Sequence, residues 1–191
     1  MADVFEARAD LNEWRERLWP LIESTAWLDW LLLTKRPQNV ERMVPWKGSW
    51  PANVWLGTTA ESQRYADMRI PRLLETPARI HFISAEPLLG PLSIRKWRSI
   101  DWVIAGGESG HRARPTDPAW VRALRDECQE AGVAFHFKQW GHWAPMLPPG
   151  VSARHQMELR SDKKDASTLY ALGKTAAGRV LDGKTWDQMP R

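Results

Sequence analysis

The sequence is poor in cysteine and contains no long apolar run. Its 191 residues include one cysteine, Cys128, so neither an intramolecular disulfide nor a zinc site built from cysteine pairs can form. No apolar run approaches the roughly 20 residues that a transmembrane helix needs. The first ten residues are acidic and lack the apolar centre of a signal peptide. We therefore expect a protein of a reducing, cytoplasmic setting without a membrane partner.

Phenylalanine and tyrosine are also scarce, with four and two residues, whereas tryptophan occurs 13 times. Most of these tryptophans are expected in the core, because the indole ring buries a large area. The formal net charge is +4. This small excess permits an anionic partner such as nucleic acid, but acidic and basic residues alternate along the chain, which is typical of a solvated surface.

Five short apolar runs, each ending in polar residues, are separated by segments with helical features. The runs lie at 28–37, 53–62, 78–90, 102–110 and 132–141. Alternation of this kind predicts repeated βα units and a parallel sheet. Helices are expected at 10–24, 62–75 and 117–132, the last capped by Asp117 and ended by Gly132. In the first helix, Pro20 is expected to kink or end the regular part, and helical spacing predicts one face made of Leu11, Trp14, Leu18 and Leu21 or Ile22 that meets the core.

The character of the chain changes after Trp143. A proline-rich break follows, and residues 151–168 are polar and mixed in charge, which favours a surface loop or partial disorder. We therefore divide the chain into a barrel-like domain at 1–145 and an irregular tail at 146–191.

The polar strand ends carry the functional prediction. Ligands of parallel α/β folds bind at the carboxyl ends of the strands, where the loops converge. Any strand must end in a polar loop, so each end alone favours a structural role, and only the five together favour a shared site. The candidate ligand-binding residues are Lys35, Arg36, Thr59, Glu61, Ser84, Glu86, Gly106, Gly107, Glu108, Ser109, Arg114, Lys138 and Gln139.

The stretch WVIAGGESG, Trp102 to Gly110, is the most suggestive of these ends. Two glycines permit a tight turn and a close approach by a ligand, and Glu108 follows them. The stretch matches neither the dinucleotide-binding fingerprint nor a phosphate-binding P-loop. His81 and His136 lie within apolar strands and are expected to be satisfied core histidines, so we assign no metal site and no catalytic residue.

Seven ordered segments resemble a phage and prophage family labelled phage protein gp thirty-seven/gp sixty-eight. They are DWLLLTKRP, NVWLGTTAE, ISAEPLLGP, DWVIAGGESG, ARP, FKQWG and AGRVLDGKTW. The resemblance implies a fold similar to a radical S-adenosylmethionine (SAM) barrel. Members of that family begin with three closely spaced cysteines, which resemble an iron–sulfur cluster site and are absent here.

The resemblance implies an α/β fold, an incomplete (β/α) barrel of about five parallel strands with helices outside and an irregular C-terminal tail. It implies a rim that binds SAM or a nucleotide-like ligand; a [4Fe–4S] cluster would need cysteines from a missing N-terminal segment. The free edge of such a barrel would be covered by the N-terminal helix or by a partner chain. Two alternatives stay open, a nucleic-acid-binding or -processing accessory protein and an inactive fragment, and whether the chain is an enzyme is left open.

Overall fold

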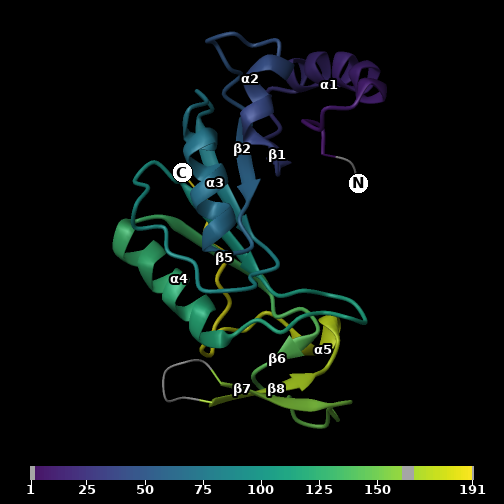
Figure 1. The fold of residues 1–191 in the computed structure, drawn as a ribbon, viewed down its shortest axis with the longest axis vertical. Helices are drawn as coiled ribbons and strands as arrows, with labels where there is room; N and C mark the ends of the chain where they lie inside the picture. Colours follow the sequence, from purple (N-terminus) through teal and green to yellow (C-terminus); the bar gives the residue numbers. More distant parts are fainter. Residues whose placement is uncertain (1–2, 161–165, 191) are drawn as a thin grey trace.

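The structure is a computed structural model that describes residues 3–160 and 166–190. Its centre is a parallel sheet in which the five strands follow one another in sequence order, as predicted (Figure 1). The strands are β1 (Trp30–Thr34), β2 (Val54–Thr59), β3 (Ile80–Ala85), β4 (Trp102–Gly106) and β5 (Ala134–Gln139). The described residues do not close this sheet into a barrel, so the prediction of an incomplete barrel is confirmed.

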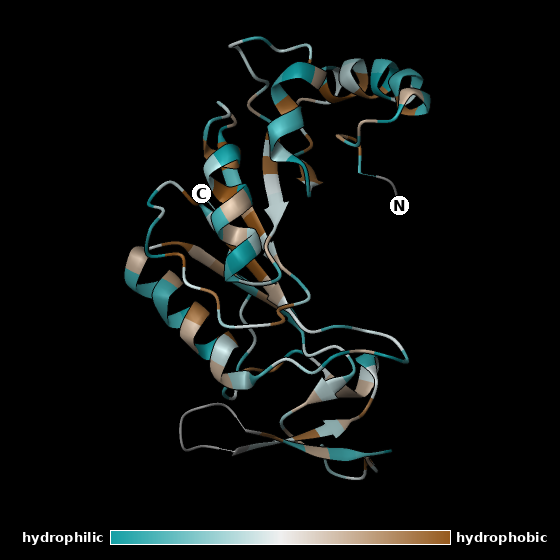
Figure 2. Ribbon diagram, in the orientation of Figure 1, coloured by the Kyte–Doolittle hydropathy of each residue, from teal (hydrophilic) through white to brown (hydrophobic). Residues whose placement is uncertain are grey.

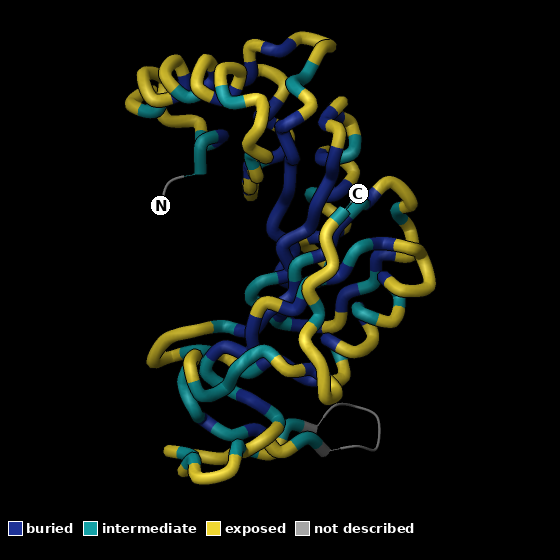
Figure 3. The backbone as a smooth tube through the Cα atoms, turned by 180° about the vertical axis from the view of Figure 1, so that it is seen from behind, coloured by how far each residue is buried: buried dark blue, intermediate teal, exposed yellow. Residues whose placement is uncertain are grey.

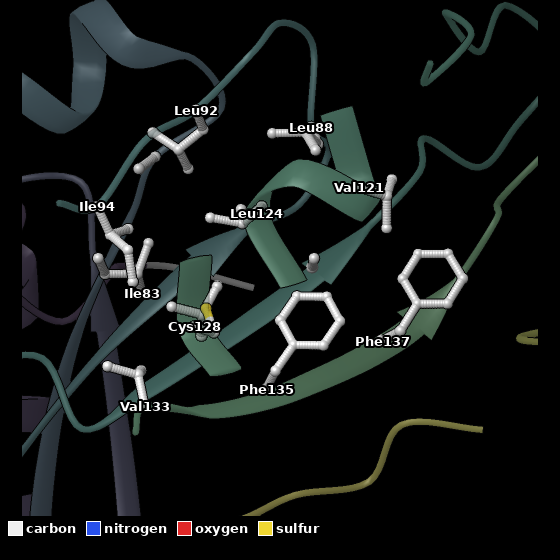
Figure 4. Packing of buried hydrophobic residues seen from close by; sticks show 14 of the residues in the cluster. Ile83, Leu88, Leu92, Ile94, Val121, Leu124, Cys128, Val133, Phe135 and Phe137 are labelled. Carbon is white, nitrogen blue, oxygen red and sulfur yellow. The ribbon is translucent and has the colours of Figure 1, made fainter. Parts of the chain in front are cut away.

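Helices α3 (Gln63–Leu74) and α4 (Pro118–Ala131) lie on the same side of the sheet (Figure 1). Val121, Leu124 and Cys128 of α4 pack with Phe135 and Phe137 of β5 in the largest buried cluster (Figure 4). Hydrophobic residues follow the strands, while the outward sides of the helices are hydrophilic (Figure 2). This helix-covered face holds most of the core.

Helix α4 follows its sequence signals. The Asp117 carboxylate accepts a hydrogen bond from the Ala119 N–H at 2.8 Å, as an N-cap does. Pro118 occupies the first helical position, and Gly132 ends the helix in the left-handed conformation at φ 70°. The predicted helix at 117–132 is confirmed.

The N-terminal helix differs from its prediction. After a 3₁₀ turn, η1 (Ala9–Leu11), α1 (Asn12–Ser24) continues through Pro20 and buries Trp19 and Ile22. The prediction that Trp14 faces the core is wrong, since it is 62% exposed. Trp19 instead stacks on Phe5 and meets the edge of Trp46. Contacts with these two residues from other segments therefore determine which side of α1 is buried.

Two short helical segments, η2 (Pro37–Asn39) and α2 (Val40–Met43), connect β1 to β2. The connection between β3 and β4 contains no helix and packs Leu88, Leu92 and Ile94 into the core. None of the helices that the structure describes is long and apolar enough to cross a membrane.

The C-terminal part is more regular than its composition indicates. β6 (Trp143–Ala144), β8 (Ala166–Ala171) and β7 (Gln156–Arg160) form an antiparallel sheet in that order, and α5 (Lys174–Ala177) follows. The expected loop at 151–168 therefore contains strands, although its residues 161–165 lie outside the described part. Buried Leu169 and Ala171 supply the apolar side that polar neighbours conceal in the sequence.

The two edges of the parallel sheet differ. The tail covers β5, because the Phe137 N–H donates to the Trp186 carbonyl and the Gln188 N–H to the Phe135 carbonyl. No described backbone segment pairs with the outer edge of β1. The expected cover from the N-terminal helix is not found, because Trp19 and Ile22 of α1 pack with Leu32 on the face of β1 rather than along its edge.

Candidate ligand-binding rim

The face of the sheet without helices, the uncovered face, has an aromatic floor that is itself largely buried, with Phe82 2% and Trp102 5% exposed. Gly57, Phe82 and Trp102 are register partners on adjacent strands, and a Cβ on Gly57 would overlap the Phe82 ring. Trp102 meets the ring of Trp55 edge-on at 6.1 Å between centroids. Its indole N–H is buried and has no acceptor among the described residues. The missing side chain of Gly57 thus allows the ring of Phe82 to lie flat against the strand.

A hollow of about 370 Å³ opens on this face. It is lined by Leu31, Leu33, Phe82, Ser84, Glu86, Trp102, Ile104, His136 and Lys138. Three of these, Ser84, Glu86 and Lys138, were predicted from the strand ends. The others are side chains of the strand interiors, and the alternation of neighbouring positions along β1, β3, β4 and β5 is the signal that could have found them.

Glu86, Lys138, Gln139 and Ser109 form one hydrogen-bonded group at the carboxyl end of the sheet. Lys138 Nζ lies 2.9 Å from one Glu86 oxygen, and Gln139 Nε2 donates to the other at 2.9 Å. The same amide nitrogen lies 3.1 Å from Ser109 Oγ. The register between β4 and β5 shifts at Ala105/Gly106, so that Lys138 falls outside the ladder. The structure thus brings together four of the predicted residues from three strand ends.

His136 lines the same hollow as Glu86, Lys138 and Trp102. Burial lowers the pKa of His136 below its ordinary value, and the positive charges of Arg179 and Lys138 lower it further. The imidazole is therefore neutral at pH 7. A neutral ring beside Trp102, with centroids 6.0 Å apart, extends the aromatic surface without adding charge.

Lys35, Arg36, Thr59 and Glu61 belong to a second network. Glu61 receives Lys35 Nζ at 2.7 Å and Arg69 at 2.9 Å, and Arg36 reaches two N-terminal carboxylates, Asp3 at 3.2 Å and Glu6 at 2.9 Å. The Thr59 carbonyl also accepts from Arg69. These charges are neutralised by one another.

The pKa of Glu61 reflects this pairing. Burial acts to raise it, but the hydrogen bond from Lys35, backbone hydrogen bonding and the charges of Lys35 and Arg69 together lower the pKa of Glu61. Its carboxylate therefore stays ionised at neutral pH, held by two cations. A structural role accounts for this network without a ligand.

The Glu108 carboxylate forms an ion pair with Arg114 of the ARP segment. The Arg114 backbone N–H and Nε donate to one carboxylate oxygen at 2.7 and 2.8 Å, and a terminal nitrogen donates to the other at 2.8 Å. These hydrogen bonds lower the pKa of Glu108 to about 2. The structure thus joins Glu108 to Arg114 rather than to the Glu86 group.

Gly106 and Gly107, the two predicted glycines, allow other parts of the same chain to pack closely against the loop after β4. A Cβ on Gly107 would overlap the Trp140 carbonyl, and one on Gly106 would lie 3.2 Å from a Glu86 oxygen. The His142 N–H donates to the Glu108 carbonyl at 2.8 Å, which ties the two loops together. The loop after β4 is thereby held directly against the loop after β5.

The residues do not fit an iron–sulfur cluster. Cys128 is fully buried in the core, and burial raises the pKa of its thiol to about 12. A cluster takes at least three cysteine thiolates, and the chain has one cysteine. Among the described residues no group of three or more potential His, Cys, Asp or Glu ligands gathers to hold a metal.

The chain belongs to the family described as "Protein of unknown function (DUF5131)", whose model matches residues 1–190. The description of this family assigns it no function and no phage origin. No curated protein and no solved structure matches the chain. The functional argument therefore rests on the rim itself.

Proposed function

We propose that this chain is a phage-type, radical-SAM-like barrel protein that binds SAM or a related nucleotide-like ligand in the hollow. The observation that carries the proposal is the pairing of an aromatic and aliphatic floor with one acid and one base at its rim. Phe82, Trp102 and Ile104 form the floor, and Glu86 and Lys138 form the charged pair. Small-molecule sites typically combine apolar walls with a few convergent polar groups.

The ligand class follows from this combination. An aromatic floor suits a purine ring, because ring faces and edges attract one another. Glu86 suits the ammonium of an amino-acid group, and Lys138 suits a carboxylate or a phosphate. In SAM the purine and the amino-acid group are parts of one molecule. The Lys138 side chain is 52% exposed and the Glu86 side chain 17% exposed, so a ligand ammonium would have to replace Lys138 beside the largely buried Glu86 carboxylate.

No reaction is proposed for this chain. Because its own residues do not fit a cluster, radical chemistry would require cysteine thiolates that these 191 residues do not contain. The proposal concerns binding at the rim alone.

The test is isothermal titration of the folded chain with SAM, and separately with adenosine and methionine. We expect saturable binding of SAM that is weakened about tenfold or more by Glu86→Gln. The loss of one charge-assisted hydrogen bond costs about 1.5–3 kcal/mol. Glu13→Gln is the matched control, because it removes an exposed pair with Arg17 on α1, outside the residues that line the hollow.

Two results would contradict the proposal. One is the absence of any heat of binding with a sample whose circular dichroism shows a folded protein. The other is SAM binding that Glu86→Gln and Lys138→Gln leave unchanged, since the ligand would then lie elsewhere.

The competing proposal is a nucleic-acid-binding accessory role. His111 and Arg112 favour it, because both are exposed and neither has a carboxylate partner among the described residues. The cations of the TKRP segment and Arg114, in contrast, are held by carboxylates. Binding to single-stranded DNA or RNA that weakens steeply with salt would favour this role. Its absence at low salt would leave the small-ligand proposal alone.

A further inference from the structure

The outer edge of β1 is an unpaired strand edge beside exposed apolar residues. β1 is the outermost strand, on the side of the N-terminus (Figure 1). The Trp30 N–H donates to the Asn53 carbonyl, toward β2, so the alternation of the backbone turns the N–H groups of Leu31 and Leu33 away from β2. Neither has a partner among the described residues.

The side chains of this strand are exposed as well. Leu31 is 44% exposed and Leu33 is 42% exposed, both on the uncovered face. Trp27 and Leu28, just ahead of the strand, are 79% and 49% exposed. Parallel sheets are ordinarily covered on both faces and protected at their edges, so an unprotected apolar edge indicates a docking surface.

The free edge of β1 ends at Lys35, the next residue whose backbone N–H points away from β2. The Lys35 N–H donates to the Asp3 carboxylate at 3.0 Å, and the same carboxylate accepts from Thr34 Oγ1 at 2.9 Å. The N-terminal segment thus closes the edge after Leu33. Two residues with outward N–H and C=O groups remain available.

The sequence along the edge is self-complementary. Alternate residues place Asp29, Leu31, Leu33 and Lys35 on one side, which reads acidic, apolar, apolar, basic. In an antiparallel pair centred on Leu32 of each strand, Leu31 lies opposite Leu33 of the second copy. Asp29 and Lys35 flank β1, so Asp29 comes near Lys35 of the second copy through its side chain alone, because Asp3 already holds the Lys35 N–H. The Asp29 carboxylate has no partner among the described residues, whereas Lys35 already binds Glu61 and is 54% exposed.

We propose that this chain forms a two-fold symmetric dimer by antiparallel pairing of β1 with β1 of a second copy. Four backbone hydrogen bonds form, because Leu31 of each copy exchanges both its bonds with Leu33 of the other. The interface is isologous, so one patch complements itself. The two uncovered sheet faces lie on the same side of the joined sheet, with the leucines at the seam between them.

The test is sedimentation velocity over a concentration series, with the folded state checked by circular dichroism. We expect a concentration-dependent species of twice the chain mass. Leu31→Lys and Asp29→Lys should each raise the dimer dissociation constant at least tenfold, the first by loss of apolar contact and the second by placing two lysines opposite each other. Amide exchange at Leu31 and Leu33 should slow as the dimer forms.

Matched controls lie on α1. Leu21→Lys changes a leucine that is 48% exposed, and Glu16→Lys makes the same change in charge as Asp29→Lys on an exposed residue. Both controls should leave the dissociation constant unchanged.

Three results would overturn the proposal. The chain could remain monomeric at every concentration, or it could form a dimer that neither β1 variant weakens. It could also remain monomeric while an added extended apolar peptide slows exchange at Leu31 and Leu33, which would assign the edge to a different partner. Leu31 and Leu33 also line the hollow, whereas Asp29 does not. SAM titration of the Asp29→Lys variant therefore separates a failure of this proposal from a failure of the proposed function.

Discussion

At the scale of single residues, the absence of a side chain on the glycines after β4 allows other backbone to pack directly against them. Gly107 packs against the Trp140 carbonyl, and Gly141 packs in turn against the Glu108 carbonyl. Gly141 also adopts φ 82°, which disfavours any other residue. The sequence indicated a tight turn and a close approach by a ligand at Gly106 and Gly107, whereas the structure places backbone of the same chain against Gly107. The sequence could not indicate that the approaching backbone is the loop after β5, because that contact joins residues more than 30 positions apart.

The first prediction concerns this contact. Gly107→Ala should lower the free energy of unfolding by about 2–4 kcal/mol, because the new Cβ must displace backbone rather than a flexible side chain. Gly90→Ala is the control, since its Cβ would meet only Ser62 Cβ at 3.8 Å, and it should change stability by less than about 1 kcal/mol. Urea denaturation measures both. Equal stabilities of the two variants would refute the explanation.

Glu108 gives a prediction about pH. Its pKa is about 2 in the folded protein and near 4.5 ordinarily, so the folded state favours the ionised carboxylate. The contribution to stability is present above about pH 4.5 and is lost as the pH falls toward 2. Because Arg114 is 61% exposed, solvent screening keeps this contribution small. Glu108→Gln should be less stable than the parent at pH 7.

Urea midpoints measured between pH 7 and pH 2 check this expectation. The difference between Glu108→Gln and the parent should shrink steadily below pH 4.5. A difference that stays constant over the whole range would mean that the Glu108 carboxylate does not titrate as described.

At the scale of elements, α4 and α1 show where local sequence suffices. The signals of α4 are local, since Asp117 caps it, Gly132 ends it and one apolar stripe faces the sheet. Helix α1 carries apolar residues around much of its circumference, and only contacts with Phe5 and Trp46 select Trp19 over Trp14. Helix α3 shows the same limit. Its spacing predicts Tyr65 and Met68 on the inward face, but Tyr65 is 37% and Met68 56% exposed, and the Arg69 guanidinium lies 4.4 Å from the centre of the Tyr65 ring.

The cap of α4 carries a prediction at this scale. Asp117→Ala should destabilise the protein by about 1 kcal/mol, because the Ala119 N–H loses its acceptor. Asp126→Ala on the same helix is the control, and it should cost less, because its side chain is 58% exposed and only pairs with the neighbouring Arg125. Thermal unfolding compares the two variants. An equal loss in both would exclude the cap as the cause.

At the scale of the whole molecule, the position of the rim could be predicted from the sequence, but the ion-pair and hydrogen-bond partners of its residues could not. Parallel strands place their carboxyl ends at one edge, so the convergence of Ser84, Glu86 and Lys138 followed from the strand pattern. The partners of the other charges come from distant segments, Asp3 and Arg69 among them, and no spacing in the sequence indicates them. The uncovered face itself, with α1 and the small sheet at opposite ends of the molecule, appears only in three dimensions (Figure 3).

The central claim is that a nucleotide-like ligand lies on the floor of the hollow. The most direct measurement follows the indole N–H signals of the tryptophans by nuclear magnetic resonance during addition of SAM, with Trp102 assigned through Trp102→Phe. We predict that the Trp102 signal shifts in a saturable way, while those of exposed Trp14 and Trp27 do not move. A Trp102 signal that stays fixed at saturating SAM, or shifts spread equally over all three, would contradict the claim.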